Sequence, residues 1–229
     1  MYKDSRSIIG IVGKPENMNE RFHYIKINDE IKRKIIENKA LPIGILPLDN
    51  KYQLKGENNK YELDSEDIKN IAEVIKKMDG IVLQGGIVSN TYEEVIVRIC
   101  IKYNKPILGI CSGFNNMIRA LGGTLSVEEK DIHNKYELEY AHEVILEKSS
   151  ELYKILKKDK ILVNSIHRYV ANEKNIKGFK IAAICPIDNT VEAIEIPNHK
   201  FAIGIKWHPE FMPEMNNLFK KFVESCLEK

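Results

Sequence analysis

The chain has 229 residues, of which 43% are hydrophobic and 30% are charged. This composition is typical of a globular protein that buries roughly 70% of the surface of its unfolded chain, and it excludes disorder and collagen-like repeats. The 35 basic and 33 acidic residues leave a formal charge of +2, so nothing favours a nucleic acid or an anionic membrane as partner. We expect a small-molecule partner and, because no apolar run approaches the ~18 residues of a membrane span, a cytoplasmic location.

Short apolar runs alternate with helical stretches in the first half of the chain, as in a parallel sheet with helices packed on its faces. We expect Ser65 to be the N-cap of one of these helices. The predicted strands lie at residues 8–12, 42–46, 80–83 and 106–110, and the predicted helices lie at 24–38, 65–77, 91–103 and 113–121.

After Gly122 and Gly123 the pattern changes to strands joined by short turns, which predicts a mixed or antiparallel part of the sheet. These strands are predicted at residues 143–146, 161–163, 179–185, 191–196 and 201–206, and the charged run 154–160 is interpreted as a solvated helix end and turn. No internal repeat or linker interrupts the sequence, so we expect residues 1–229 to form one domain.

The four cysteines are Cys100, Cys111, Cys185 and Cys226, and none is spaced like a zinc-ligand pair or a disulfide framework. We therefore expect no metal and no cofactor, and each cysteine has to be judged by its own surroundings.

Cys111 has the surroundings of a nucleophile. It lies in Gly109-Ile110-Cys111-Ser112-Gly113, between a predicted strand and a predicted helix. A sharp strand-to-helix turn exposes such a side chain, and flanking glycines avoid collisions with neighbouring backbone. The helix N-terminus favours the reactive thiolate. The alternative is a buried structural cysteine in a glycine-rich turn.

A thiol nucleophile needs a base whose ring is held in one orientation. His208 follows the predicted strand 201–206, which would deliver it to an end of the sheet, and Glu210 can accept a hydrogen bond from its imidazole. Taken alone, a histidine after a strand is more often a satisfied surface or core residue than a catalytic one.

Gln84-Gly85-Gly86 ends another predicted strand. Adjacent glycines let backbone amides approach a ligand atom, as an oxyanion hole requires, with the amide that follows the nucleophile as the second donor. The alternative is a plain tight turn.

Together, these elements resemble the class I glutamine amidotransferase superfamily and, within it, the gamma-glutamyl-gamma-aminobutyrate hydrolase branch. The resemblance runs from about Ser7 to the C-terminal helix. It implies a flavodoxin-like α/β fold, with a mostly parallel central sheet and helices on both faces. It also implies a Cys-His-Glu triad that hydrolyses a gamma-glutamyl amide through a thioester. The motifs that carry it are GIVLQGG at 80–86, PILGICSGF at 106–114, GGTL at 122–125, HEV at 142–144, VNSIH at 163–167, VEA at 191–193 and GIKWHPE at 204–210.

The resemblance assigns a role to individual residues of this chain. Cys111 matches the nucleophile, His208 the general acid and base, and Glu210 the acid that orients the histidine; the backbones of Gly86 and Ser112 match the oxyanion hole. The residues that it places near the substrate are Gly85, Ser89, Asn90, Asn115, Ser165, His167 and Arg168.

Four positions depart from the branch pattern. Ser112 stands where arginine is usual and Asn115 where glutamine is usual, while Arg168 and Tyr169 replace a histidine or glycine and a glutamine. Because these positions are expected to line the pocket, we expect a substrate other than gamma-glutamyl-GABA itself.

Three functions are compatible with the resemblance. The first is a stand-alone gamma-glutamyl hydrolase, and the second is a glutaminase subunit that passes ammonia to a separate synthetase partner. The third is a non-catalytic ligand-binding relative, which the presence of all three triad residue types disfavours. A homodimer is compatible with each of them.

Overall fold

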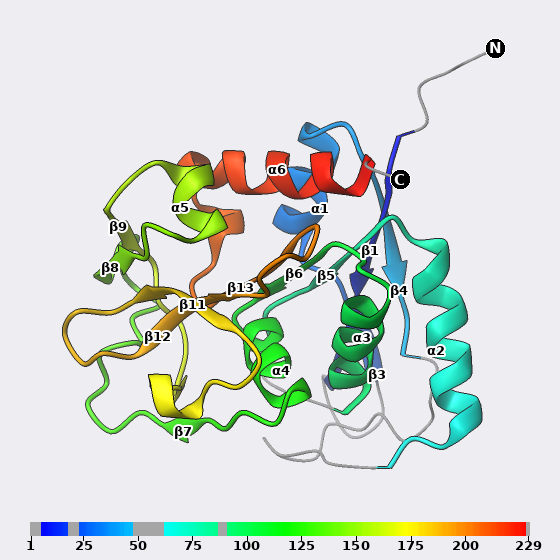
Figure 1. The fold of residues 1–229 in the computed structure, drawn as a ribbon, viewed down its shortest axis with the longest axis horizontal. Helices are drawn as coiled ribbons and strands as arrows, with labels where there is room; N and C mark the ends of the chain where they lie inside the picture. Colours follow the sequence, from blue (N-terminus) through cyan, green and yellow to red (C-terminus); the bar gives the residue numbers. More distant parts are fainter. Residues whose placement is uncertain (1–5, 18–22, 48–61, 87–90, 228–229) are drawn as a thin grey trace.

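The computed structural model describes residues 6–17, 23–47, 62–86 and 91–227. Its main feature is a nine-stranded sheet with helices on both faces (Figure 1). In spatial order, the strands of this sheet are β4 (Leu41–Ile45), β1 (Ile8–Val12), β5 (Gly80–Leu83), β6 (Ile107–Ile110), β13 (Ala202–Ile205), β12 (Val191–Glu195), β11 (Lys180–Ile184), β8 (His142–Leu146) and β9 (Lys160–Val163).

The strand directions divide this sheet into two parts. The five strands from β4 to β13 are parallel to one another, whereas β12, β11, β8 and β9 alternate in antiparallel pairs. This division confirms the change of pattern expected after Gly123. Two small antiparallel pairs lie outside the main sheet: β2 (Lys14–Asn17) with β3 (His23–Lys26), and β7 (Ser126–Val127) with β10 (Tyr169–Val170).

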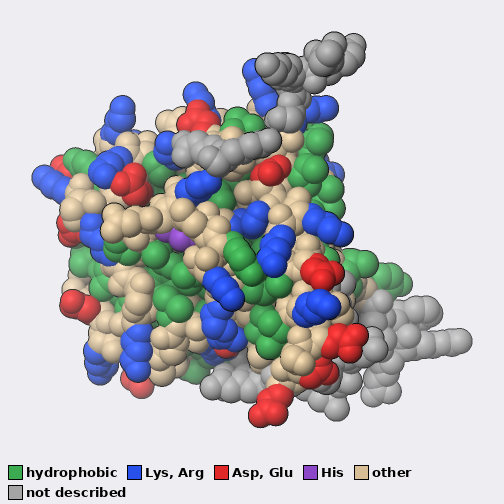
Figure 2. All heavy atoms as spheres, turned by 45° about the vertical axis from the view of Figure 1, so that its right-hand side comes forward, with side chains coloured by type: hydrophobic (Ala, Val, Ile, Leu, Met, Phe, Trp, Pro, Cys, Tyr) green, Lys and Arg blue, Asp and Glu red, His purple; other side chains and the backbone are tan. Residues whose placement is uncertain are grey.

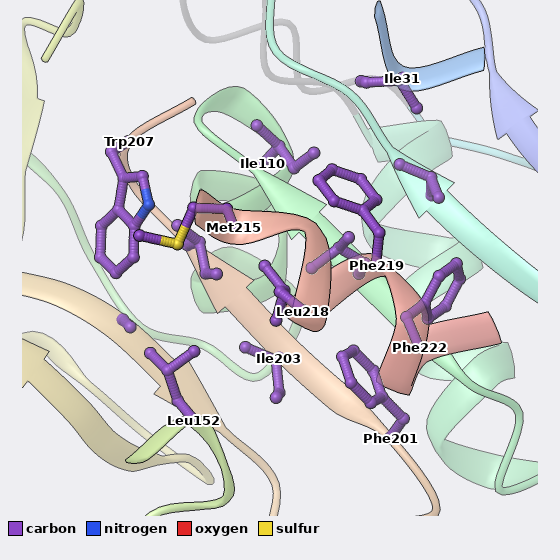
Figure 3. Close-up of a cluster of buried hydrophobic side chains, with 14 of the residues drawn as sticks. Ile31, Ile110, Leu152, Phe201, Ile203, Trp207, Met215, Leu218, Phe219 and Phe222 are labelled. Carbon is purple, nitrogen blue, oxygen red and sulfur yellow. The ribbon is translucent and has the colours of Figure 1, made fainter. Parts of the chain in front are cut away.

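Six helices form the two outer layers in the described part of the chain. One face carries α1 (Asp29–Glu37), α5 (Glu151–Leu156) and α6 (Asn216–Leu227), and the other carries α2 (Ser65–Lys77), α3 (Thr91–Lys102) and α4 (Ser112–Ala120) (Figure 1). Side chains of β6 point alternately to the two faces of the sheet, so that Leu108 and Ile110 pack toward α6 while Ile107 packs toward α3 and α4. Figure 3 shows aromatic side chains of α6, Phe219 and Phe222, over this central part of the sheet.

The predicted helix at residues 24–38 is wrong in its first part. Residues 24–26 belong to β3, and the helix begins at Asp29. The side chain of Asn28 accepts a hydrogen bond from the amide of Glu30 at 2.9 Å and so caps the helix at that point. Before this cap, Tyr24 and Ile25 are residues that favour a strand.

The predicted N-cap at Ser65 is also wrong, because Asp64 caps α2. Its carboxylate accepts hydrogen bonds from the amides of Glu66 and Asp67, and the Asp67 carboxylate accepts one in return from the amide of Asp64. This reciprocal arrangement needs an acid three residues after the cap, and the spacing is met from Asp64 but not from Ser65.

Basic and acidic side chains are interspersed over the face shown in Figure 2, in keeping with the nearly balanced charge of the sequence. No helix in the described ranges has both the length and the apolar character needed to cross a membrane.

Candidate active site

The predicted strand-turn-helix setting of Cys111 is present in the structure. Cys111 lies between β6 and α4 with φ 52° and ψ −102°, a backbone conformation that residues other than glycine rarely adopt. A Cβ atom at Gly113 would lie 2.2 Å from the carbonyl oxygen of Leu83, so only glycine lets the first turn of α4 pack against β5. The thiol therefore stands at the N-terminus of α4, where the helix dipole favours its thiolate.

His208 is held through both its backbone and its ring. The side chain of Asn164 accepts a hydrogen bond from the His208 amide at 2.8 Å and donates one to the His208 carbonyl at 2.9 Å. On the ring, Nδ1 lies 2.9 Å from Oε1 of Glu210, which also accepts a hydrogen bond from Asn28 at 3.2 Å. With Nδ1 engaged by the carboxylate, Nε2 remains to exchange a proton with a reacting group.

Three separate strand ends bring the predicted catalytic elements together. A Cβ atom at Gly85 would lie 2.7 Å from Cε1 of His208 and 3.5 Å from Cβ of Cys111. Gly85, Cys111 and His208 follow the parallel strands β5, β6 and β13, whose carboxyl ends meet at one edge of the sheet. This edge is the usual position of a site in such sheets.

The electrostatics of the site favour a thiolate and an imidazolium. Burial alone would raise the pKa of the Cys111 thiol, but its hydrogen bond and charge interaction with His208 outweigh burial, so the pKa lies below its ordinary value. Burial alone would lower the pKa of His208, but Cys111 and Glu210 raise it well above the ordinary value. Each group therefore stabilises the charged form of the other.

Cys111 is expected to be alkylated by iodoacetamide at lower pH than an ordinary cysteine. Because its pKa is lowered, the thiolate persists below the ordinary midpoint of about 8.5. Burial raises the pKa of Cys185 to about 11 and that of Cys226 to about 12, so these thiols should stay unmodified in the folded chain. Peptide mapping after alkylation across a pH series measures both effects, and a Cys111 midpoint at or above 8.5 would contradict the ion pair.

A cavity of about 500 Å³ opens in front of Cys111. The described residues that line it include no carboxylate, whereas the exposed Arg168 supplies a positive charge. The cavity therefore suits an anionic ligand. Its lining residues are Gly86, Cys111, Ser112, Asn115, Asn134, Ile166, His167, Arg168, Tyr169 and His208.

The other predicted substrate residues are placed differently. Ser165 is fully buried, and its hydroxyl donates a hydrogen bond to the carbonyl of His133 at 2.7 Å, away from the cavity lining. Gly85 adjoins His208 and Cys111, as described above. Ser89 and Asn90 lie outside the described residues.

Several residues that support the site were not predicted from the sequence. Buried Lys14 forms an ion pair with Glu93, and its ammonium also donates to Oγ of Ser112 at 3.1 Å. The side-chain amide of Gln84 bonds to the carbonyls of Val12 and Lys26, and its oxygen accepts from the amide of Asn28. For Gln84, the signal available in the sequence was its position directly after a buried strand.

Two further buried groups lie near the cavity. The ammonium of Lys206 donates a hydrogen bond to the Asn115 side chain at 2.6 Å, and burial lowers its pKa to about 8. His133, His142, His167 and Glu192 form a set of described side chains that could hold a metal ion.

The match to the Peptidase C26 family, together with this sheet order and this cysteine turn, identifies a domain of the class I glutamine amidotransferase type, with its flavodoxin-like fold. The chain belongs to the Peptidase C26 family, which matches residues 87–210, more than half of its length. The expected superfamily and fold class are thereby confirmed.

Similar proteins of known sequence are CTP synthases. That of Chlamydia trachomatis is 27% identical over 193 residues, which cover 70% of this chain and 35% of the relative. That of Methanosphaera stadtmanae is 27% identical over 96% of this chain and 44% of the relative. The chain thus spans between 35% and 44% of the length of these curated relatives.

Two solved structures share the fold. The glutaminase domain of Trypanosoma brucei CTPS with bound acivicin has a TM-score of 0.70 at 18% identity, covering 97% of this chain and 94% of that chain. A Thermoplasma acidophilum protein described as a component of GMP synthase has a TM-score of 0.65 at 15% identity, covering 97% and 95%.

Proposed function

We propose that residues 1–229 form one hydrolase domain, which cleaves a gamma-glutamyl amide, glutamine included, through a thioester on Cys111. The observation that carries the proposal is the mutual stabilisation of the Cys111 thiolate and the His208 imidazolium at the N-terminus of α4. A preformed nucleophile beside a proton donor is what acyl transfer from an amide requires.

In the first half-reaction, the Cys111 thiolate attacks the gamma-carbonyl carbon and forms the carbon–sulfur bond. The carbonyl oxygen becomes an oxyanion, for which the backbone amides of Gly86 and Ser112 are the proposed donors, since both residues line the cavity beside Cys111. His208 then gives its proton to the amide nitrogen. The carbon–nitrogen bond breaks, the amine or ammonia leaves, and the thioester remains.

In the second half-reaction, neutral His208 takes a proton from a water molecule, whose oxygen attacks the thioester carbon. The carbon–sulfur bond breaks, glutamate leaves, and the thiolate and imidazolium are restored. Throughout, the role proposed for Glu210 is to hold the ring of His208 through Nδ1 and to stabilise its charge.

A substrate screen tests this function. The pure chain is incubated with glutamine, gamma-glutamyl amino acids and gamma-glutamyl amines, and released glutamate is measured. We expect rapid hydrolysis of at least one compound by the chain alone. Absence of glutamate release and of any thioester intermediate, with Cys111 intact, would instead support a non-catalytic relative.

Arg168 is proposed to bind an anionic group of the substrate. Its guanidinium is exposed at the cavity wall, where a carboxylate or phosphate could pair with it in a bidentate way. Arg168→Ala should raise KM about tenfold or more, as expected from losing roughly 1.4 kcal/mol of binding, with little change in kcat. Steady-state kinetics on neutral and anionic gamma-glutamyl compounds measure this.

The pattern across that panel identifies which group Arg168 binds. If it binds the acceptor side, KM rises only for compounds whose acceptor carries an anion; if it binds the glutamyl carboxylate, KM rises for all of them. Arg33→Ala, on the exposed face of α1, is the matched control and should change neither constant. An unaltered KM across the whole panel would place Arg168 outside the site.

A second candidate is a glutaminase component that supplies ammonia to a synthetase partner. It is favoured by the CTP synthases among the relatives and by the likeness to a protein described as a component of GMP synthase. In this case the pure chain should hydrolyse glutamine slowly and accelerate when the synthetase is added. Fast hydrolysis of a gamma-glutamyl compound other than glutamine, without any partner, would favour the stand-alone hydrolase.

A further inference from the structure

A compact group of side chains, here called the histidine cluster, extends inward from His167 in the cavity lining and has no assigned step in the proposed hydrolysis. Its members come from four segments: His133 from the loop before β8, His142 from the start of β8, His167 from the loop after β9, and Glu192 from β12. All four are buried, and one ligand atom from each lies within 4.8 Å of the others.

Two of the imidazoles have a hydrogen-bond partner at the ring nitrogen that faces away from the cluster, and this contact orients each ring. Nδ1 of His142 lies 3.2 Å from the carbonyl oxygen of Glu143, which can only accept, so Nε2 of that ring faces the cluster without a proton in the neutral form. Nε2 of His133 lies 3.0 Å from a carboxylate oxygen of Asp188, so Nδ1 of His133 faces the cluster. Acceptors behind ligating histidines are the usual outer partners of metal sites.

The other two members are buried polar groups with few partners. Neither carboxylate oxygen of Glu192 and neither ring nitrogen of His167 lies within ordinary hydrogen-bond geometry of a described residue, although these side chains are only 1% and 3% exposed. Glu192 does interact electrostatically with the side chains of Thr190 and Lys206. Leaving buried polar atoms unsatisfied is costly, and such groups in a native protein call for an ion, a water molecule or a catalytic role. The nearby Lys206 ammonium is bonded to Asn115.

We propose that the histidine cluster binds one divalent transition-metal ion of the zinc type. Imidazole nitrogen with a single carboxylate is a donor set that Zn²⁺ accepts, and four protein ligands leave no open position. The bound ion would therefore be structural. It would tie the segment that carries His167 and Arg168, part of the cavity wall, to β8 and β12.

The spacing of the donor atoms suits such an ion. Nδ1 of His133 lies 3.0 Å from Nε2 of His142 and 3.5 Å from Oε1 of Glu192, and that oxygen lies 3.7 Å from Nε2 of His167. Ligands at the usual zinc distance of about 2.0–2.1 Å in a tetrahedron are roughly 3.3 Å apart.

Binding requires two local changes. Metal–nitrogen bonds replace the contact between the facing nitrogens of His133 and His142, and any protons on the ligand atoms leave to solvent. The His167 ring, now stacked on His133 at 4.8 Å with an interplanar angle of 19°, turns so that its nitrogen faces the ion. No hydrogen bond to a described residue opposes this rotation.

Metal binding is tested with a tag-free chain that carries Cys111→Ala, so that the thiolate and His208 cannot hold the ion themselves. After removal of metal by a chelator, the chain is titrated with Zn²⁺ or Co²⁺. We expect one ion per chain and a Co²⁺ absorption spectrum of tetrahedral nitrogen and oxygen coordination. At saturating Zn²⁺ we expect a rise in Tm of roughly 5–10 °C.

Variants locate the ion. Glu192→Gln and His142→Gln should each weaken Zn²⁺ binding at least tenfold, whereas His199→Gln, a half-buried histidine outside the cluster, should leave it unchanged. If the cluster variants do not fold, the Co²⁺ spectrum and the Tm shift of the Cys111→Ala chain still decide. A chain that binds no Zn²⁺, or whose Co²⁺ spectrum is that of the solvated ion, would show that the cluster holds no metal, and the proposed metal site would be overturned.

Discussion

Replacing Cys111 with alanine is expected to reduce the rate of gamma-glutamyl amide hydrolysis by at least three orders of magnitude. In the proposed mechanism the thiolate sulfur of Cys111 bonds to the substrate, and no other cysteine is among the described residues that line the cavity. The fold should survive, because the substitution removes only one sulfur atom beside the cavity and leaves the turn between β6 and α4 in place. Glutamate release measures the loss, and circular dichroism checks the fold.

Cys226→Ala is the matched control. Its thiol is also buried, but it lies in α6, where Sγ is 3.1 Å from the carbonyl oxygen of Phe222. Hydrolysis by this variant should stay near the wild-type rate, and a glutamine-analogue label should still map to Cys111. Near-normal turnover in Cys111→Ala, or a label on another cysteine, would overturn the proposed mechanism.

The local part of the site could be predicted because it is formed by residues that are close together in the sequence. The glycines around Cys111 indicate a tight turn, in which a side chain at Gly113 would collide with β5. The residues before Cys111 form a buried strand. The pair His208 and Glu210 is likewise local, since two residues of spacing bring the carboxylate to Nδ1. Such signals need no knowledge of distant contacts.

The supporting contacts could not be predicted in this way. Asn164 clamps the backbone of His208 across 44 residues of sequence, and Asn28 reaches Glu210 across 182. Nothing in the residues adjacent to either asparagine specifies these partners. The error at residues 24–26 has the same origin, because a two-stranded pairing with residues 14–17 determines the structure of a segment that could also be helical.

The histidine cluster illustrates a further limit. The spacing of the cysteines in the sequence predicts no metal site. The four clustered side chains are spread from residue 133 to residue 192 and become neighbours only when β8, β12 and two loops pack together. A rule based on the spacing of ligands within one turn or hairpin therefore does not detect these four residues.

His208→Asn is expected to abolish acylation. Without the imidazolium, the thiol of Cys111 loses the partner that lowers its pKa, and the leaving amine loses its proton donor. We expect kcat/KM to fall by about three orders of magnitude, and rapid-quench measurements should show no burst of released amine. An unchanged burst would mean that another group protonates the leaving amine.

Glu210→Gln is expected to be milder, with a loss of roughly ten- to a hundredfold. The glutamine oxygen can still accept the hydrogen bond from Nδ1 of His208, so the ring keeps its orientation, but the negative charge that helps to raise the pKa of His208 is gone. Because His208 then loses its proton more readily, the high-pH limb of the pH–rate profile should move to lower pH. Asp29→Asn, which removes an exposed carboxylate on α1, serves as the control and should leave the profile unchanged. A wild-type rate and profile in Glu210→Gln would show that the protein uses a Cys111–His208 dyad and that Glu210 is structural.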